Sequence, residues 1–178
     1  MLNLPNKKYK VIYADPPWLF RTRSDKGKEK SPEAHYDCMS LNDICNMPVR
    51  DIADENCVLL MWVCDPMLDQ ALKVIEAWGF KYKTVGFTWA KTNSKSLGFF
   101  TGLGYWTRSN PEMCLLATKG KPKRNSKSIP QLVVEQRQEH SRKPDIIYNH
   151  IENMLDGPYV ELFARRKRNN WHSWGNEV

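Results

Sequence analysis

The stretch Val11-Ile12-Tyr13-Ala14-Asp15-Pro16-Pro17-Trp18 joins an apolar run to an acid, two prolines and an indole. β-Branched and aromatic residues favour a buried strand, and a pair of prolines ends it because proline lacks an amide hydrogen. Ligands of open α/β sheets bind just beyond the carboxyl ends of the strands. We therefore predict that Asp15 and the Pro16 carbonyl accept hydrogen bonds from an amino group. Trp18 is expected to expose a flat face on which a nucleobase stacks, although these residues also suit an ordinary strand end with a core tryptophan.

The rest of the chain alternates strand-like and helix-like segments, which predicts an α/β fold. Near-continuous apolar runs indicate a mostly parallel sheet with helices on both faces. The predicted strands are Lys10–Ala14, Cys57–Val63, Thr84–Ala90, Glu112–Thr118 and Tyr159–Ala164. The predicted helices are a short one capped by Ser40, one that Asp65 caps and Gly79 ends, and one from Pro144 to Gly157. The length of 178 residues fits one domain over residues 1–178.

The charge of the chain points to a polyanionic partner. Its formal net charge is +7, from 27 basic and 20 acidic side chains. The excess gathers in residues 21–30, 119–127 and 165–168, all beside expected loops, and such patches favour nucleic acid. Long connections cover residues 19–39, 91–110 and 119–142, and loops beyond about 12–15 residues are usually functional or disordered.

Cysteine and histidine usage argues against a metal site and against secretion. The 5 cysteines form no C-x-x-C pair, and the 4 histidines show no metal-ligand spacing. We expect reduced thiols in a cytoplasmic protein. The longest apolar run, residues 57–64, is far shorter than the ~20 residues that span a bilayer. No signal peptide is expected at the amino terminus.

The carboxyl-terminal segment has the character of a cofactor site. Val160–Arg165 is a strand that runs into a charged loop, followed by Asn170-Trp171 and Gly175-Asn176-Glu177. Polar side chains beside a strand end suit ribose hydroxyls, whereas the absence of G-x-G-x-x-G argues against a dinucleotide. Seen alone, the same segment is also an ordinary last strand with a basic tail.

Taken together, these segments resemble the adenine-N6 methyltransferases that carry a D-P-P-W signature. That family includes the catalytic subunit of the eukaryotic mRNA N6-methyladenine writer and its bacterial and phage DNA-modifying relatives. The similarity runs in order through nearly the whole chain. Its segments are Ala14–Trp18, His35–Ser40, Leu60–Val63, Trp89–Asn93, Thr101–Trp106, Ser141–Asp145, Glu161–Arg165, Asn170-Trp171 and Gly175–Glu177.

The resemblance implies a Rossmann-like methyltransferase fold that uses S-adenosylmethionine, with the catalytic motif preceding the cofactor-binding strand. It gives Asp15, Pro16, Pro17 and Trp18 a catalytic role on adenine N6, with no metal and no covalent intermediate. The amine would attack the sulfonium methyl while Asp15 and the Pro16 carbonyl draw electron density onto nitrogen. The target adenine must be single-stranded or flipped out of a duplex.

The resemblance also assigns further contacts. Trp18, Tyr36 and Lys91 are the expected substrate-binding residues. Lys143 is expected to face the methionine carboxylate, and Arg165, Asn176 and Glu177 the ribose. The complete set of expected cofactor-binding residues is Asp15, Lys143, Phe163, Arg165, Asn169, Asn176 and Glu177.

The chain departs from the family pattern in three places. The family often binds the cofactor adenine through an acidic residue well upstream of the signature, and because only fourteen residues precede Asp15 we expect that contact to come from elsewhere. The family's His-Asn pair has no clear match between Arg165 and Trp171, where Asn169 could substitute. Glu177 replaces a neutral residue, and its carboxylate can accept both ribose hydroxyls.

DNA is the favoured polymer because the compact chain resembles the DNA-modifying relatives. Loops 19–39 and 119–142 are then expected to read a short or relaxed target sequence. The same chemistry on RNA, and a catalytically inactive nucleic-acid-binding subunit, stay as alternatives, and a homodimer stays open. Cytosine N4 is disfavoured, since enzymes of that kind tend to carry Ser where this chain has Asp15.

Overall fold

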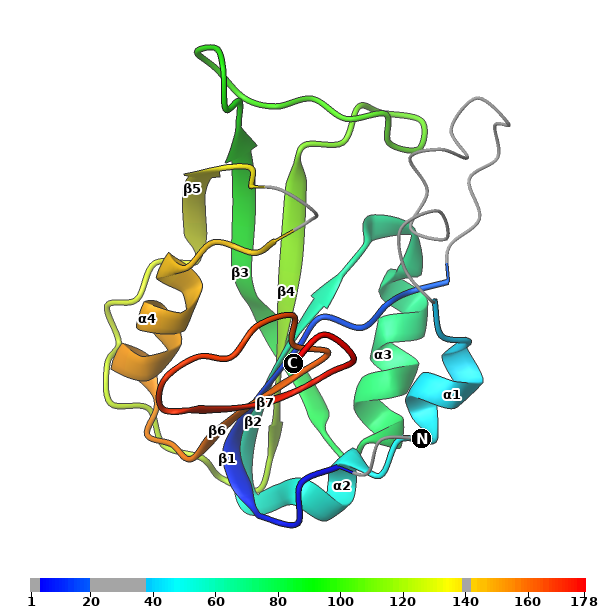
Figure 1. Ribbon diagram of the computed structural model, residues 1–178, viewed down its shortest axis with the longest axis vertical. Coiled ribbons are helices and arrows are strands. Elements are labelled where there is room, and N and C mark those ends of the chain that lie inside the picture. The colour runs from blue at the N-terminus through cyan, green and yellow to red at the C-terminus, as the bar shows by residue number, and fades with distance from the viewer. Residues whose placement is uncertain (1–3, 20–37, 139–141) are drawn as a thin grey trace.

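The computed structural model describes residues 4–19, 38–138 and 142–178, and Figure 1 shows how its elements are arranged. Seven strands and a few short helices make up this part of the chain. The strands are β1 (Tyr9–Ala14), β2 (Ala53–Val63), β3 (Lys81–Thr92), β4 (Pro111–Lys119), β5 (Leu132–Gln136), β6 (Tyr159–Leu162) and β7 (Trp171–Trp174). The helices are α1 (Leu41–Cys45), α2 (Val49–Ile52), the 3-10 turn η3 (Asp65–Met67), α3 (Leu68–Ala77) and α4 (Ile146–Met154).

All seven strands form one sheet in the order β5-β3-β4-β2-β1-β6-β7. Only β4 runs antiparallel to its neighbours, β2 and β3, while the other neighbouring pairs are parallel. This confirms the mostly parallel sheet. The carboxyl ends of β1, β2, β3, β5 and β6 consequently share one edge with the amino end of β4, and Asp15 follows β1 at that edge.

Helices cover both faces of the sheet, as expected (Figure 1). Residues of β1 alternate between two cores: Ile12 packs with α1, α2 and α3, whereas Tyr13 packs with α4. The apolar stripe of α3, with buried Ala71, Val74 and Ile75, explains why that helix lies flat on one face. The fold thereby matches a methyltransferase of the Rossmann-like class.

Two strands were not expected from the sequence. β5 lies inside the polar connection 119–142 and pairs with β3, and the Trp89 indole donates to the Glu135 carbonyl at 3.0 Å. β7 follows the basic tail and pairs with β6. Both are edge strands with a single buried residue each, Val133 in β5 and Trp171 in β7, so neither shows the long buried run by which the other strands were predicted.

The expectation that the whole of loop 119–142 reads the target is wrong for its first half. Because β4 is antiparallel, its carboxyl end lies on the side of the sheet opposite to Asp15, where the parallel strands begin. Lys119 pairs there with Cys57, at the start of the apolar part of β2. Asn125 bonds to the Met154 carbonyl at the end of α4, again far from that edge. The other loop, 19–39, lies almost wholly outside the described residues.

Helix ends differ in detail from the expectation. Asp65 does not cap a helix, since the chain passes through η3 before α3 begins and Met67 precedes α3 without a side-chain cap. Gly79 ends the helical segment as predicted, with a φ of 83° that favours glycine. Within the described ranges, no helix is long and apolar enough to cross a membrane.

Candidate active site

Asp15 and Lys143 meet at the carboxyl end of β1. Asp15 leaves the strand just before the two prolines, and Lys143 lies three residues before α4, so β1 and α4 fix the two ends of the pair. The Lys143 ammonium lies 2.6 Å from Asp15 Oδ2. The Lys143 side chain is only 9% exposed, and its ammonium lies 5.3 Å from the centre of the Trp62 ring. A contact across 128 residues of chain thus joins two of the predicted site residues.

Glu112 completes this site, although it was not among the site residues predicted from the sequence. Its carboxylate lies 3.2 Å from Lys143 and 2.5 Å from Lys91. We call Asp15, Lys143, Glu112 and Lys91 the Asp15 cluster. Lys91, predicted to bind substrate, joins the cluster through Glu112 because β3 and β4 pair at this edge. The only signal for Glu112 in the sequence is a carboxylate at the start of an otherwise apolar strand.

The electrostatics of the Asp15 cluster favour the charged forms of Glu112 and Lys143. Burial alone would raise the pKa of Glu112, but the ammonium groups of Lys143 and Lys91 hold it below its ordinary value. Burial alone would lower the pKa of Lys143, but Asp15 and Glu112 raise it above its ordinary value. Both charges therefore persist at neutral pH despite burial. Lys143 already contacts two carboxylates, and its expected contact with the methionine carboxylate stays a prediction.

The expectation that Trp18 exposes its indole is wrong. Trp18 is 4% exposed and packs in the core beneath α1 and α3. Its Nε1 donates to the Trp62 carbonyl at 3.1 Å, which ties it to the end of β2. A large aromatic ring gains more from core burial than from exposure, so the alternative of a core tryptophan at a strand end is the one that holds.

The two prolines shape the backbone around the acid. The Pro16 carbonyl accepts the Trp18 amide at 2.9 Å, and the Pro17 carbonyl accepts the Met39 amide at 3.0 Å. These bonds fix the turn that presents Asp15. A carbonyl oxygen has two lone pairs, so the Pro16 carbonyl retains one for a substrate amine.

Two buried polar atoms on neighbouring strands lack partners among the described residues. They are Glu161 Oε2 on β6 and Ser173 Oγ on β7, and the two residues are paired in register. Glu161 Oε1 accepts the Tyr148 hydroxyl at 2.8 Å. Burial raises the pKa of Glu161 to about 7. Unsatisfied buried acceptors are costly, and a ligand that donates to them would repay that cost. Glu161 was not among the expected site residues.

The predicted ribose contacts gather where β6 ends. Phe163 has a φ of 63° and its ring packs edge-on against Trp174 at 5.7 Å. Arg165 Nε lies 3.8 Å from Glu177 Oε1, so two of the expected contacts lie together. Gly175 approaches the Ala164 carbonyl so closely that a Cβ there would lie 2.2 Å from the oxygen. The close approach places the exposed Asn176 beside the same strand end.

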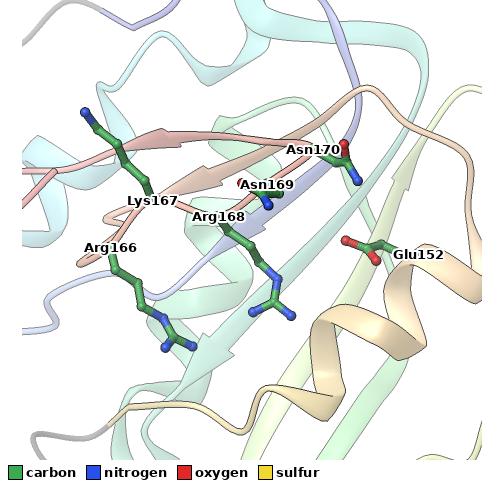
Figure 2. A pocket seen from close by; sticks show the side chains of 6 residues that line it. All are labelled: Glu152, Arg166, Lys167, Arg168, Asn169 and Asn170. Carbon is green, nitrogen blue, oxygen red and sulfur yellow. The ribbon is translucent and has the colours of Figure 1, made fainter.

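Asn169 lies in a separate hollow between α4 and the turn before β7. Figure 2 shows this pocket, which has a volume of about 430 Å³. Its lining is Glu152, Arg166, Lys167, Arg168, Asn169 and Asn170. No contact joins Asn169 to the Asp15 cluster in the described part of the chain. Tyr36 lies outside the described residues.

The arrangement suits a reaction in which the amine of the substrate is itself the nucleophile and no side chain of the protein has to act as one. Lys143 uses one oxygen of Asp15, and Oδ1 can accept a hydrogen bond from an exocyclic amine. No group of three or more metal-ligating side chains occurs within residues 4–19, 38–138 and 142–178. The site therefore offers directed hydrogen-bond acceptors in a charge-balanced, partly buried setting, which favours positioning as its means of catalysis.

Comparison with known proteins gives consistent matches. The family model described as MT-A70 matches residues 9–177. The Type II methyltransferase M.MunI of a Mycoplasma species is 33% identical over 193 residues, with 98% of this chain and 80% of that protein covered. A putative N(6)-adenosine-methyltransferase MT-A70-like protein of Medicago truncatula is 31% identical, and human METTL3, an N(6)-adenosine-methyltransferase catalytic subunit, is 27% identical. The chain spans 26% and 28% of the length of these two eukaryotic relatives.

Proposed function

Because the chain belongs to the MT-A70 family, we propose that it transfers a methyl group to the exocyclic N6 of adenine in DNA. MT-A70 methyltransferases use S-adenosylmethionine as the methyl donor and act on adenine in nucleic acid. The family resemblance read from the sequence is thereby confirmed. The DNA substrate, a short or relaxed target sequence and the residue roles are parts of the proposal.

The contact between Asp15 and Lys143 is the observation that carries the proposal. It fixes a carboxylate at the carboxyl end of β1, where open α/β sheets bind their ligands. The N6 lone pair of adenine is delocalised into the ring and is a poor nucleophile. Asp15 Oδ1 and the Pro16 carbonyl would each accept a hydrogen bond from one of the two N6 N–H groups, which increases the electron density on nitrogen. Once N6 has bonded to the methyl carbon and the carbon–sulfur bond of the donor has broken, the surplus N6 proton would pass to solvent, so Asp15 orients the amine and need not deprotonate it beforehand.

S-Adenosylmethionine supplies an electrophilic methyl group. The described residues of this chain offer acceptors for the hydrogen-bond donors of that cofactor. Glu161 Oε2, a buried acceptor without a partner among the described residues, suits a ribose hydroxyl or the methionine ammonium. Arg165 and Glu177 lie within an ion-pair distance of each other beside the same strand end. The close approach of Gly175 to Ala164 keeps side-chain bulk out of that position. These features support the expected cofactor contacts with Arg165, Asn176 and Glu177.

Coverage of the relatives favours DNA over RNA. The chain covers 80% of a type II methyltransferase, a class of DNA-modifying enzyme, but only about a quarter of the adenosine methyltransferases. RNA adenine is the second candidate, because the eukaryotic relatives share the same span of this chain. An inactive binding subunit is disfavoured because Asp15, Lys143 and Arg165 are all present and in contact with charged partners.

The experiment is methyl transfer from labelled S-adenosylmethionine to matched single-stranded DNA, duplex DNA and RNA, followed by nucleoside analysis. We expect N6-methyladenine in DNA. Asp15→Asn keeps the shape of the side chain but should lower the rate at least a hundredfold, with cofactor affinity within about tenfold, or 1.4 kcal/mol. Asp69→Asn on the exposed face of α3 is the matched control. Full activity of Asp15→Asn would contradict the proposed role of Asp15. Label found in RNA alone would show that RNA, and not DNA, is the substrate.

A further inference from the structure

Three arginines converge on one carboxylate beside the active site. Arg142 Nη2 lies 2.6 Å from Asp145 Oδ2, Arg168 Nη1 lies 3.2 Å from Asp145 Oδ1, and Arg166 contacts the same Oδ1. We call these four residues the arginine cluster. Partial burial alone would raise the pKa of Asp145, but its bonds to Arg142 and Arg166 keep it below its ordinary value. Asp145 is therefore ionised and carries one negative charge.

The arginine cluster has more positive charge than it neutralises. Three guanidinium groups against one carboxylate leave a surplus of two charges. Glu152, across the pocket on α4, offsets one of them while it accepts the Trp171 indole at 2.7 Å. Lys167 lines the same pocket, but its side chain points away from the two neighbouring arginines (Figure 2). At least one positive charge is thus left for an external anion.

The hydrogen-bond inventory gives the same result. Each guanidinium has five N–H donors, so three provide about fifteen, whereas a carboxylate accepts about four bonds. Arg166 and Arg168 both reach the same oxygen, Asp145 Oδ1, and both line the pocket that Glu152 also lines (Figure 2). Paired, parallel N–H donors are the geometry that binds phosphate and carboxylate oxygens in a bidentate way. The pocket volume of about 430 Å³ leaves room for such a group.

The two arginines are held in place before any ligand arrives. The Arg168 guanidinium lies 4.0 Å from the centre of the Tyr148 ring, whose hydroxyl is bonded to Glu161. Arg166 is fixed by Asp145 yet remains 40% exposed. Side chains that are already ordered lose less conformational entropy on binding. Their donors are accessible and pre-organised, unlike those of lysines on a solvated surface.

The arginine cluster lies close to Lys143 in the chain and thereby close to Asp15 in space. Asp145 is two residues from Lys143, which contacts Asp15, and two residues of chain span at most about 7 Å. Glu161 interacts electrostatically with both sites. Burial is the main cause of its raised pKa; in addition, Asp15 raises this pKa, whereas Arg166 and Arg168 lower it. An oligonucleotide whose adenine reached Asp15 would carry its own phosphates past the arginines.

We propose that the arginine cluster binds a phosphate of the substrate strand, within one or two nucleotides of the adenine at Asp15. The inference deepens the proposed function, on which it rests for the identity of the anion. The methionine carboxylate of the cofactor shares the same chemistry and is the other source of an anionic group. Arg166 and Arg168 provide the positive charge, and Asp145, just before α4, holds their guanidinium groups in position.

The test measures binding of an adenine-containing single-stranded DNA by fluorescence anisotropy at 50–200 mM salt. Arg166→Gln/Arg168→Gln is compared with Lys123→Gln/Arg124→Gln, which removes the same charge at the far edge of the sheet. We expect the cluster variant to bind about tenfold more weakly than the control variant. Its salt slope should shrink by about 0.7, the value for one phosphate contact on a single strand. Cofactor affinity should stay within twofold in both variants.

A scan with neutral methylphosphonate linkages tests the same contact without relying on a variant that folds. One linkage near the adenine should weaken binding to the unaltered protein about tenfold, and should cause no further loss in the cluster variant. A salt slope equal to that of the control variant, or no sensitive linkage, would overturn the proposal. Loss of cofactor affinity with unchanged DNA binding would assign the cluster to the methionine carboxylate and also overturn it. Cluster-dependent binding without any methylation would instead contradict the proposed function alone.

Discussion

The Asp15 cluster and the arginine cluster include neighbouring residues of the chain, Lys143 and Arg142, yet they handle charge in opposite ways. The Asp15 cluster is mostly buried and pairs two carboxylates with two ammonium groups. The arginine cluster is partly exposed and sets three guanidinium groups against one carboxylate. A buried charge must be paired because desolvation costs several kcal/mol per ion, whereas solvent screens an exposed surplus. The comparison separates charges that hold the site together from charges that remain available to a ligand.

The aromatic support of the Asp15 cluster should give the largest stability effect. Trp18→Ala empties a core position that ties the end of β2 to the D-P-P-W turn. We expect a loss of about 3–5 kcal/mol in the free energy of unfolding, measured by urea denaturation. Trp106→Ala, at a fully exposed loop position, should change it by less than about 0.5 kcal/mol. Similar small losses for both variants would contradict the burial of Trp18.

Charge balance in the Asp15 cluster is tested by Glu112→Gln. This change removes one of the two carboxylates of the Asp15 cluster and leaves Asp15 as the remaining carboxylate of that cluster. We expect a loss of about 3 kcal/mol in the free energy of unfolding, because a broken buried pair leaves an uncompensated charge. Glu76→Gln, on the exposed face of α3, serves as the control and should be near neutral. An equal, small effect in both would mean that the balance adds nothing to stability.

Glu161, which lies between the two clusters, should make stability depend on pH. Its folded-state pKa of about 7 exceeds the value of about 4.3 in an unfolded chain. The folded state binds more protons between these values, so stability contributed by Glu161 falls as pH rises from about 4.5 to 7. Glu161→Gln should therefore stabilise the protein by about 1–3 kcal/mol at pH 8 and by almost nothing at pH 4.5.

The same variant separates stability from cofactor binding. If Glu161 accepts a hydrogen bond from S-adenosylmethionine, Glu161→Gln should weaken cofactor binding at pH 8 while it raises the melting temperature of the free protein. Calorimetric titration and thermal melting at pH 8 provide the two measurements. A variant that is stabilised yet binds the cofactor as tightly as the unaltered protein would exclude Glu161 from the cofactor site.

The smallest effect is expected in the arginine cluster. Arg142→Gln removes one of three arginines on Asp145, and both partners of that pair are more than 40% exposed. Asp145 keeps Arg166 and Arg168, so the free energy of unfolding should change by less than about 1 kcal/mol. Urea denaturation beside Glu112→Gln gives the direct comparison. A loss of unfolding free energy as large as that of Glu112→Gln would show that ion pairs in the two clusters contribute equally to stability.

Much of the site could be predicted from the sequence because its parts lie at strand ends. Asp15, Lys91 and Lys143 each follow or precede an apolar segment that is legible by itself, and the parallel sheet brings those ends to one edge. Glu112 could not be predicted in this way. Its strand is antiparallel, so its amino end and not its carboxyl end reaches the site, and a run of apolar letters does not reveal strand direction.

The same antiparallel strand explains the error about loop 119–142. A basic loop after a strand was expected beside the site, but β4 delivers Lys119 to the opposite edge, and Asn125 is still bonded there to the end of α4. β5 then returns the chain, so that only its end at Gln136 approaches the active edge. Local charge indicated a partner for this loop, while topology decided which part of it lies near the site.

The sequence by itself determined the family, the sheet class and the acid at the end of β1, because these depend on local apolar runs and on ordered motifs. Only the tertiary structure decided that Trp18 is buried and that Lys143 joins Asp15 to Glu112. It also decided that Arg142, Arg166 and Arg168 share Asp145. Burial and charge balance depend on what other segments place around a side chain. The physical reason is that desolvation and pairing act between residues far apart in the chain, and no local pattern records them.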